Sequence, residues 1–376
     1  MKNFTLAVAL LITCSVQSQI GMGTPNPDAS AVLELASTQK GFLPPRLTTL
    51  QRNAIVQPAE GLTIYNTNKD CLEWYNKSGW YNSCGDNPPA VASYTCNTLE
   101  TGTMTAGDPV SGVSQTITAT VSAPGSYDIS ATNNGVTFSA RGNFPSKGKQ
   151  DVILRATGIP VAIGFHKFTL NTTPGCSFDR PTIDANTVVG KANKIWMAYN
   201  LGATAPATSS TDTAQYGDLY QWGRDTDGHE KKTSLNTPTL SSTDTPVDGK
   251  FITTTTSSSY DWRSTANDKL WQGATGTNNP CPAGFRIPKV QEWEDEFTAS
   301  NIVDGVTAYN SVLKLPLTNY RYYDGSLASI GTNSSYWSSD IDTTNRKSFY
   351  IYIISSGKGS GSAVRGYGLS VRCIKE

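Results

Sequence analysis

The sequence predicts a multidomain, β-rich fold, and three features of the chain support this class. With 376 residues, the chain is longer than one ordinary domain. Thr, Ser, Gly and Asn are abundant and long helical patterns are scarce, which favours short strands joined by many turns. The 30 basic and 30 acidic side chains balance each other without runs of either sign. Because such a chain has no field that attracts nucleic acid, we expect no nucleic-acid partner.

Residues 1–18 have the pattern of an export signal peptide. Lys2 provides a positive charge, and residues 4–13 form an apolar run that is too short to span a bilayer. Gln19 would then begin the mature protein, which we expect to be secreted or displayed at the cell surface. The alternative is a lipid anchor at Cys14, because the residues around it loosely resemble a lipoprotein box. No later segment predicts a transmembrane span.

Removal of the signal leaves six cysteines, an even number that favours disulfides in an exported protein. The composition changes near residues 90 and 182, and each resulting block contains two cysteines. We therefore expect the local pairs Cys71–Cys84, Cys96–Cys176 and Cys281–Cys373. The alternative is free thiols or a metal site. No Cys-x-x-Cys motif occurs and the chain has only 2 histidines, so we do not expect zinc.

Residues 19–89 form the first predicted module, which combines an extended arm, short strands and an aromatic hairpin. Glycines and prolines at residues 21–27 exclude a regular helix there, whereas Thr48 is a good N-cap for a short helix. Residues 72–75 and 79–81 would pair as the hairpin. A unit of this size with so few apolar residues cannot bury a core alone. We expect it to pack against another copy or a neighbouring domain.

Three motifs in this module carry a family resemblance. They are GTxNPxASAxLE at residues 23–34, KGFLPPRLT at 40–48 and GLxIYNT at 61–67. Together they resemble a leader module of secreted Bacteroidota proteins, and similar stretches occur in phage-tail-fibre-like proteins. The resemblance implies a surface location and a homotrimer assembled through the N-terminal module. It implies no chemical activity.

Residues 90–180 alternate apolar and polar side chains at the period of a β-strand. The alternating segments, separated by glycines, lie at residues 116–121, 127–130, 136–140, 150–156 and 165–170. Regular short strands at this spacing predict an immunoglobulin-like β-sandwich, which we interpret as a spacer. His166 alternates with phenylalanines, so we expect it to face solvent and not to take part in catalysis.

Residues 181–376 form the third predicted domain, with six of the eight tryptophans. A helix is expected from Pro288, because proline suits the first turn of a helix. The apolar residues on its inner face would be Val290, Trp293 and Phe297. We expect the acidic residues at 292 and 294–296 to be solvated or to favour the N-terminal end of the helix. A strand at residues 369–374 would bring Cys373 near the segment that precedes the helix.

A second resemblance covers this third domain. Its motifs are KIWMxxNLGA at residues 194–203, YGDLYQWGR at 216–224, NPCPxGFRIPxxxEW at 279–293, YWSS at 336–339 and SVRCI at 370–374. Together they resemble the Fibrobacter succinogenes major paralogous domain. That family is similar in pattern to the formylglycine-generating-enzyme branch of the C-type-lectin-like fold. The resemblance implies a small α+β, C-type-lectin-like domain with long irregular loops.

The third domain lacks the groups that catalysis in these families requires. Formylglycine-generating enzymes use cysteines, and the predicted disulfide consumes both cysteines present. The calcium-binding triplets of sugar-binding lectins are absent. Residues 225–228 suggest a calcium loop, but the remaining ligands are missing, and a polar turn is the alternative. A single histidine, His229, cannot form a catalytic triad with neighbours of its own block. We expect no enzyme, no cofactor and no bound metal.

A binding role is easier to motivate, because two stretches alternate aromatic, cationic and amide groups. Aromatic faces stack on sugar rings or peptide side chains, and arginine and aspartate satisfy hydroxyls or charges. The predicted ligand contacts are Trp262, Arg263, Arg321, Tyr322, Tyr323 and Asp324. The alternative is that the aromatic residues belong to the core. We expect an adhesin-like protein whose C-terminal head recognises a glycan or a surface protein. The other candidates are a structural fibre subunit and a degenerate enzyme fold.

The triplets Asp212-Thr213-Ala214 and Asp342-Thr343-Thr344 resemble the acceptor pattern for O-glycosylation of exported Bacteroidota proteins. They place candidate glycosylation at Thr213 and Thr343.

Overall fold

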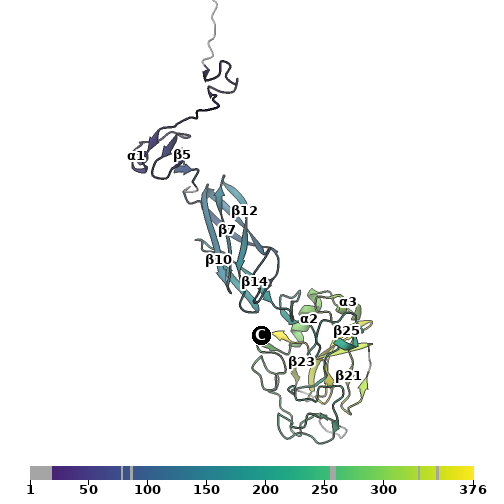
Figure 1. The fold of residues 1–376 in the computed structure, drawn as a ribbon. Coiled ribbons are helices and arrows are strands. Elements are labelled where there is room, and N and C mark those ends of the chain that lie inside the picture. Colours follow the sequence, from purple (N-terminus) through teal and green to yellow (C-terminus); the bar gives the residue numbers. More distant parts are fainter. Residues whose placement is uncertain (1–18, 78, 85–87, 255–259, 329–330, 344–346) are drawn as a thin grey trace, which may run out of the picture. The chain divides into compact units, whose positions relative to one another are not determined.

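The computed structural model of the protein describes residues 19–77, 79–84, 88–254, 260–328, 331–343 and 347–376. The predicted export signal and Cys14 lie outside these residues. The described chain is rich in strands and has few helices, which confirms the predicted multidomain β-rich class (Figure 1). None of the described helices is long and apolar enough to cross a membrane.

The described chain falls into two compact units. One unit extends to Ala92 and also includes Thr120–Tyr127 and Arg141–Gly148. The other comprises Ser93–Ala119, Asp128–Ala140 and Lys149–Glu376. The domain boundaries predicted at residues 89 and 180 stay predictions.

The N-terminal module contains two small sheets. The first pairs β1 (Ile20–Met22) with β2 (Leu33–Leu35) in parallel. The second has the order β3-β4-β5-β6, built from β3 (Arg46–Leu47), β4 (Thr63–Asn66), β5 (Cys71–Asn76) and β6 (Gly79–Asn82). Between β3 and β4 lies the short helix α1 (Thr49–Asn53). Thr48 caps it as predicted: its hydroxyl accepts the Gln51 N–H, and the Gln51 side chain accepts the Thr48 N–H.

The middle of the chain forms two sheets, as the alternating pattern predicts. The five-stranded sheet has the order β10-β11-β12-β9-β7 and the three-stranded sheet the order β13-β14-β8. Phe138 of one sheet contacts Phe168 and Phe178 of the other, with ring centroids 4.9 and 5.3 Å apart. These side chains form the core between the sheets. The strands are β7 (Val91–Thr101), β8 (Met104–Thr105), β9 (Ser114–Ala123), β10 (Gly125–Asn133), β11 (Val136–Phe144), β12 (Gly148–Gly158), β13 (Gly164–Thr169) and β14 (Ser177–Ile183).

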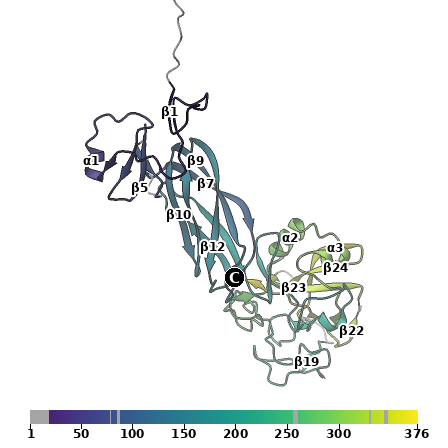
Figure 2. The ribbon, with the colours of Figure 1, turned by 45° about the horizontal axis from the view of Figure 1, so that its top comes forward.

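The C-terminal region is an α+β arrangement of short strands, two helices and long irregular segments. Its longest strands form the antiparallel sheet β23-β24-β25, and α2 and α3 both pack against β24 (Figure 2). The elements are β15 (Thr187–Val189), β16 (Ile195–Met197), η1 (Thr213–Gln215), β17 (Tyr220–Gln221), β18 (Asn236–Thr237), β19 (Phe251–Ile252), β20 (Phe285–Arg286), α2 (Val290–Ala299), α3 (Gly305–Asn310), β21 (Tyr320–Arg321), β22 (Leu327–Ala328), β23 (Asn333–Asp342), β24 (Lys347–Ile354), β25 (Gly357–Ala363), β26 (Gly368–Leu369) and β27 (Ile374–Lys375).

Helix α2 confirms the existence of the predicted helix, but it begins at Val290 and not at Pro288, Val290 is only half-buried, and its polar face needs a further correction. Trp293 and Phe297 are buried as expected. Glu296, which we expected to be solvated, is fully buried as well. Its carboxylate accepts the backbone N–H groups of Lys191 and Ala192 and the hydroxyl of Ser300. These hydrogen bonds compensate for the lost solvation, and they attach the helix to the loop before β16.

All three predicted disulfides, Cys71–Cys84, Cys96–Cys176 and Cys281–Cys373, are present. The last forms where β27 pairs with β20, with Arg286 opposite Ile374. The predicted strand at 369–374 is interrupted, however: β26 ends at Leu369 and β27 begins at Ile374. The pairing with the segment that leads into the helix is nevertheless as predicted.

The interruption of that strand coincides with a fully buried arginine. Arg372 donates to Asn200 Oδ1 from Nε and Nη2, at 3.0 and 2.9 Å, and to the carbonyls of Met197 and Leu313. Burial lowers the pKa of Arg372 to about 10, so the guanidinium is still charged at neutral pH. It connects three distant segments of the C-terminal region without a carboxylate partner among the described residues.

We expect Arg372→Ala to destabilise the C-terminal region by about 3 kcal/mol, because three buried acceptors would lose their donor. Urea unfolding followed by tryptophan fluorescence measures this, since six tryptophans are buried in the region. Lys269→Ala, at an exposed position, is the control and should change the unfolding free energy by less than about 0.5 kcal/mol. Equal stability of both variants would contradict the assigned role.

Candidate functional site

The parallel ribbon formed by β1 and β2 exposes apolar side chains on one face. Ile20 pairs with Leu33 and Met22 with Leu35, so the four side chains point to the same side. All are exposed, by 53%, 51%, 63% and 44% respectively. Parallel strands are normally buried on both faces, and an isolated two-stranded ribbon is barely stable in water. We name these four residues the ribbon face; it requires an apolar cover.

Strand β5 of the neighbouring sheet has the reverse of the usual burial pattern. Cys71 and Glu73 point inward and are buried, whereas Leu72 and Trp74 point outward and are exposed. In a monomeric sheet with one solvated face, the apolar side chains would take the inner positions. The inversion leaves two large apolar side chains on the outer face of β5, which is a property of interaction surfaces.

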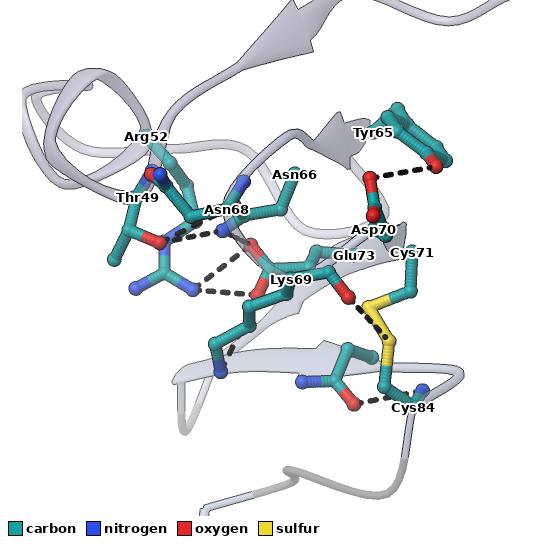
Figure 3. The surroundings of a disulfide bond; sticks show 11 residues. Thr49, Arg52, Tyr65, Asn66, Asn68, Lys69, Asp70, Cys71, Glu73 and Cys84 are labelled. Carbon is teal, nitrogen blue, oxygen red and sulfur yellow. Dashed lines mark hydrogen bonds and ion pairs between the residues drawn. A yellow bond between two sulfur atoms is a disulfide. The ribbon is translucent and has the colours of Figure 1, made fainter.

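A polar network around Glu73 fixes this orientation (Figure 3). The guanidinium of Arg52 donates to both carboxylate oxygens of Glu73, at 2.8 and 2.9 Å, and the side chain of Asn66 donates to one of them at 2.9 Å. Lys69 adds an ion pair at 3.8 Å. A buried carboxylate that is paired and hydrogen-bonded in this way is costly to turn outward. The network and the Cys71–Cys84 disulfide therefore keep Leu72 and Trp74 at the surface.

In the described part of the module, more large apolar side chains are exposed than buried. Among the described residues from 20 to 82, only Ile64, Cys71 and Tyr81 are large or sulfur-containing apolar residues that are buried. Eleven large apolar residues are exposed: Ile20, Met22, Val32, Leu33, Leu35, Phe42, Leu43, Leu50, Val56, Leu72 and Trp74. The prediction that this module cannot bury a core alone is consistent with this distribution. Exposed apolar surface of this extent marks an interaction site.

A second candidate site lies in the C-terminal region, where tyrosines from four segments line a cavity of about 600 Å³. We name it the tyrosine cleft. Its tyrosines are Tyr260, Tyr320, Tyr323, Tyr350, Tyr352 and Tyr367. Several of the rings contact each other: Tyr260 with Tyr323 at 4.9 Å, and Tyr323 with Tyr367 at 5.5 Å between centroids. Burial, assisted by the neighbouring tyrosines, raises the pKa of Tyr367, so its phenol is a neutral donor at pH 7.

Glycines on the edge strand β25 make room for two of these rings. Tyr350 lies opposite Gly361 and Tyr352 opposite Gly359 in the antiparallel pairing of β24 with β25. A Cβ atom at Gly359 would approach the Tyr352 hydroxyl to 2.5 Å. The rings therefore lie across the glycines, a position that any larger residue would disturb.

The structure corrects the predicted ligand contact at Trp262. The indole is fully buried, packs in the core with Trp222 and Trp271, and donates to the Trp222 carbonyl at 2.7 Å. Arg263 is half-buried; it pairs with Asp244 and donates to the Thr265 carbonyl. Trp262 is a core residue, which is the alternative that the sequence left open.

The segment from Arg321 to Asp324 is divided between the interior and the surface. Arg321 is 5% exposed and its guanidinium is engaged by Ser234, Asn236 and the Gly325 carbonyl, so it is not free for a ligand. Tyr323 lines the tyrosine cleft, and Tyr322 packs behind it against Tyr367. Asp324 is exposed and accepts hydrogen bonds from Ser326. Of the predicted contacts, only Tyr323 lines the cleft.

The acidic turn at residues 225–230 contains Asp227, His229 and Glu230, whose side-chain atoms lie within 4.8 Å of one another. The side chains of these three residues already have hydrogen-bond partners within the protein. His229 Nδ1 lies 2.7 Å from Asp227 Oδ1, and Nε2 accepts the Gln221 N–H at 3.0 Å. Glu230 accepts the Gly228 N–H. A hydrogen-bonded turn therefore accounts for the three residues without an ion.

His229 is neutral in this arrangement, because burial lowers its pKa although the hydrogen bond to Asp227 opposes the shift. Burial disfavours the charged form of Asp227, but the His229 hydrogen bond and the charge of Arg224 outweigh this and lower its pKa to about 2. In the unfolded chain a histidine has a pKa of about 6.5 and binds a proton when the pH falls below this value. The buried His229 of the folded chain does not bind a proton at that pH, so protonation favours the unfolded chain.

We expect the free energy of unfolding to fall as the pH is lowered from 7 to 5, and His229→Gln to reduce this slope. Glutamine can keep an acceptor for the Gln221 N–H but does not titrate. Urea unfolding at pH 5, 6 and 7 measures the effect, and His166→Gln, at the only other histidine, is the control. The same slope in the wild type and in His229→Gln would contradict the assignment.

The two candidate glycosylation sites, Thr213 and Thr343, are exposed, so both hydroxyls are accessible. Modification at these positions stays a prediction.

The comparison with known families concerns the N-terminal module. Residues 21–99 match the model of the phage tail like trimerisation region. The match contains Met22, Leu33 and Leu35 of the ribbon face, the exposed side chains of β5 and the Glu73 network. No curated protein matches the chain, and no solved structure does. Because the family match does not extend into residues 181–376, the similarity of that domain to the Fibrobacter succinogenes major paralogous domain and to the C-type-lectin-like fold stays a resemblance.

The sequence did not predict most of the tyrosine cleft. Tyr350, Tyr352 and Tyr367 lie far from residues 319–323 in the chain and are brought to them by the fold. One local signal was present. Every second residue is a glycine from Gly357 to Gly361, and this segment follows shortly after Tyr350 and Tyr352, which are also two positions apart. In a hairpin this spacing puts glycines opposite tyrosines.

Proposed function

We propose that the protein is an exported, fibre-like subunit that assembles as a homotrimer through its N-terminal module and carries the C-terminal domain as a ligand-binding head. The observation that carries this proposal is the match of residues 21–99 to a trimerisation region, because ten of the eleven exposed apolar side chains of the module lie within the matched residues. Two further copies of the chain would supply the missing cover. Three disulfides fit a protein that works outside the cell.

The tyrosine cleft supports a binding role for the head. Accessible tyrosines that line a cavity are typical of recognition sites and not of protein cores. A glycan or a surface protein is the ligand class we propose for an adhesin-like subunit, and the role is one of binding and not of catalysis. A structural fibre subunit without a soluble ligand is the second candidate, because a trimerisation module alone would suffice for it.

Light scattering on the mature chain, from Gln19 to Glu376, tests the assembly. We expect a mass about three times that of the single chain at micromolar concentration, with the three disulfides of the chain intact. A monomer under these conditions would contradict the proposed function.

A further inference from the structure

The tyrosine cleft gathers six aromatic side chains from segments that are far apart in the chain. Tyr260 follows β19, Tyr320 and Tyr323 lie in and after β21, Tyr350 and Tyr352 lie in β24, and Tyr367 precedes β26. All six are partly exposed to solvent, in contrast to the six tryptophans of the region, which are fully buried. The fold thus separates the aromatic residues into a tryptophan core and an accessible tyrosine lining.

The lining combines apolar ring faces with many hydroxyl groups. Besides the phenols, Ser335 and Ser362 contribute hydroxyls, and Asn333 contributes an amide whose buried oxygen has no hydrogen-bond donor among the described residues. Such a surface is suited to sugars, because the C–H faces of a pyranose ring stack on aromatic rings and its hydroxyls need hydrogen-bond partners. The volume of about 600 Å³ lies within the usual range of small-molecule sites.

The charge of the lining is positive. Lys347 is the one charged residue that lines the cleft among the described residues, and its ammonium group has no hydrogen-bond or ion-pair partner there. No described carboxylate lines the cleft. Asp324 lies near Tyr367, outside the lining, and its carboxylate is engaged by Ser326. An anionic group on a ligand could therefore pair with Lys347 without displacing an internal partner.

We propose that the tyrosine cleft binds an acidic oligosaccharide, whose sugar rings stack on the tyrosines and whose carboxylate pairs with Lys347. The cleft replaces Trp262 and Arg321 as the binding site of the head. A cationic peptide would meet the lysine without a lining carboxylate to pair with, and a neutral sugar would leave the lysine unpaired. The inference rests on the proposed function for the role of the head, but its test does not depend on assembly.

Calorimetric titration of the mature chain tests the proposal at pH 7 and moderate salt. The probes are uronate oligosaccharides, with trigalacturonate as the first, sulfated oligosaccharides of similar length, and neutral cellotriose. We expect at least one uronate probe to bind with a Kd below about 1 mM, and to bind about tenfold more tightly than cellotriose. Failure of every uronate probe to bind would overturn the proposal, as would equal binding of cellotriose. Tighter binding of the sulfated probes than of any uronate would overturn the choice of carboxylate.

Variants then locate the site. Tyr323→Ala and Tyr352→Ala should each weaken binding of the uronate about tenfold, whereas Tyr309→Ala, a tyrosine outside the cleft, should leave it unchanged. Gly359→Ala should weaken binding by moving the Tyr352 ring without removing it. If the three cleft variants bind as well as the wild type, the ligand lies elsewhere and the proposal fails.

Lys347→Gln should abolish the preference for the uronate over cellotriose, and Lys347→Arg should restore it. Lys269→Gln, at an exposed lysine outside the cleft, is the matched control and should keep the preference. An unchanged preference in Lys347→Gln would overturn the role of the lysine. Light scattering of the same samples separates the two proposals. A trimer that binds no uronate overturns this inference alone, and a monomer that binds one overturns the assembly alone.

Discussion

Replacing Leu33 and Leu35 together by aspartate should convert the proposed trimer into monomers. The two leucines form half of the ribbon face and are 51% and 44% exposed in the single chain. Full burial of a fully exposed leucine contributes about 1.5–3 kcal/mol. Because about half of each side chain is already covered in the single chain, a neighbouring copy would contribute about half of this per leucine. In a threefold assembly each substitution acts three times, and the introduced carboxylates would repel one another. Sedimentation or light scattering should show a threefold loss of mass at micromolar concentration.

Two exposed apolar residues of the C-terminal region provide the matched control. Leu235 and Val247 are 73% and 101% exposed, and in the sequence they lie outside residues 21–99, which match the trimerisation region. Their double replacement by aspartate should leave the trimer intact. A trimer that survives the substitutions at Leu33 and Leu35, or that is lost equally in the control, would exclude the ribbon face as the assembly surface.

Removing the disulfide Cys281–Cys373, by replacing both cysteines with alanine, should cost about 4–5 kcal/mol of the stability of the C-terminal region. The bond joins residues separated by 92 positions, so the unfolded chain gains a large loop-closure entropy when it is absent. Cys373 is also buried in the tryptophan core, where its loss leaves a small cavity. Urea unfolding monitored by tryptophan fluorescence measures the change.

The disulfide Cys71–Cys84 supplies the internal comparison, because its separation is only 13 positions and it lies in the N-terminal module. Its replacement by two alanines should leave the unfolding of the C-terminal region unchanged. A loss of less than about 1 kcal/mol for the Cys281–Cys373 replacement would show that the pairing of β20 and β27 holds this region closed by itself.

Local chemistry explains which parts of the fold are predictable from the sequence. The Thr48 cap, the burial of Trp293 and Phe297 on α2 and the alternating strands each depend on residues a few positions apart, and each is confirmed. The disulfides depend on only two cysteines per block, which limits the pairings. Glu296 was misjudged because its partners, the amides of Lys191 and Ala192, are 105 and 104 positions away and give no signal on the helix itself.

The candidate site shows the same limit in the aromatic residues. Nothing in the local sequence distinguishes Trp262, which is buried in the core, from Tyr323, which lines the cleft, because both lie within two positions of an arginine in a polar stretch. Arg321 differs from the prediction for a related reason: its guanidinium binds the carbonyls of Lys231, Ser234 and Gly325 and is not free for a ligand. Long-range packing, not residue type, decides which aromatic groups remain accessible.

The N-terminal module was the more predictable site, because a shortage of buried apolar residues is a property of composition. The structure adds the position of the apolar surface, on the ribbon face and on the outside of β5. It also adds the reason that Leu72 and Trp74 of β5 stay at the surface, which is the Glu73 network.

Subunit counting by native mass spectrometry tests the central claim most directly. Two forms of the mature chain that differ only in a C-terminal tag are expressed together and analysed without dissociation. The account predicts trimers only, in each of the four possible combinations of tagged and untagged chains. Monomers or dimers as the main species, with the Cys71–Cys84 disulfide intact, would contradict assembly through residues 21–99.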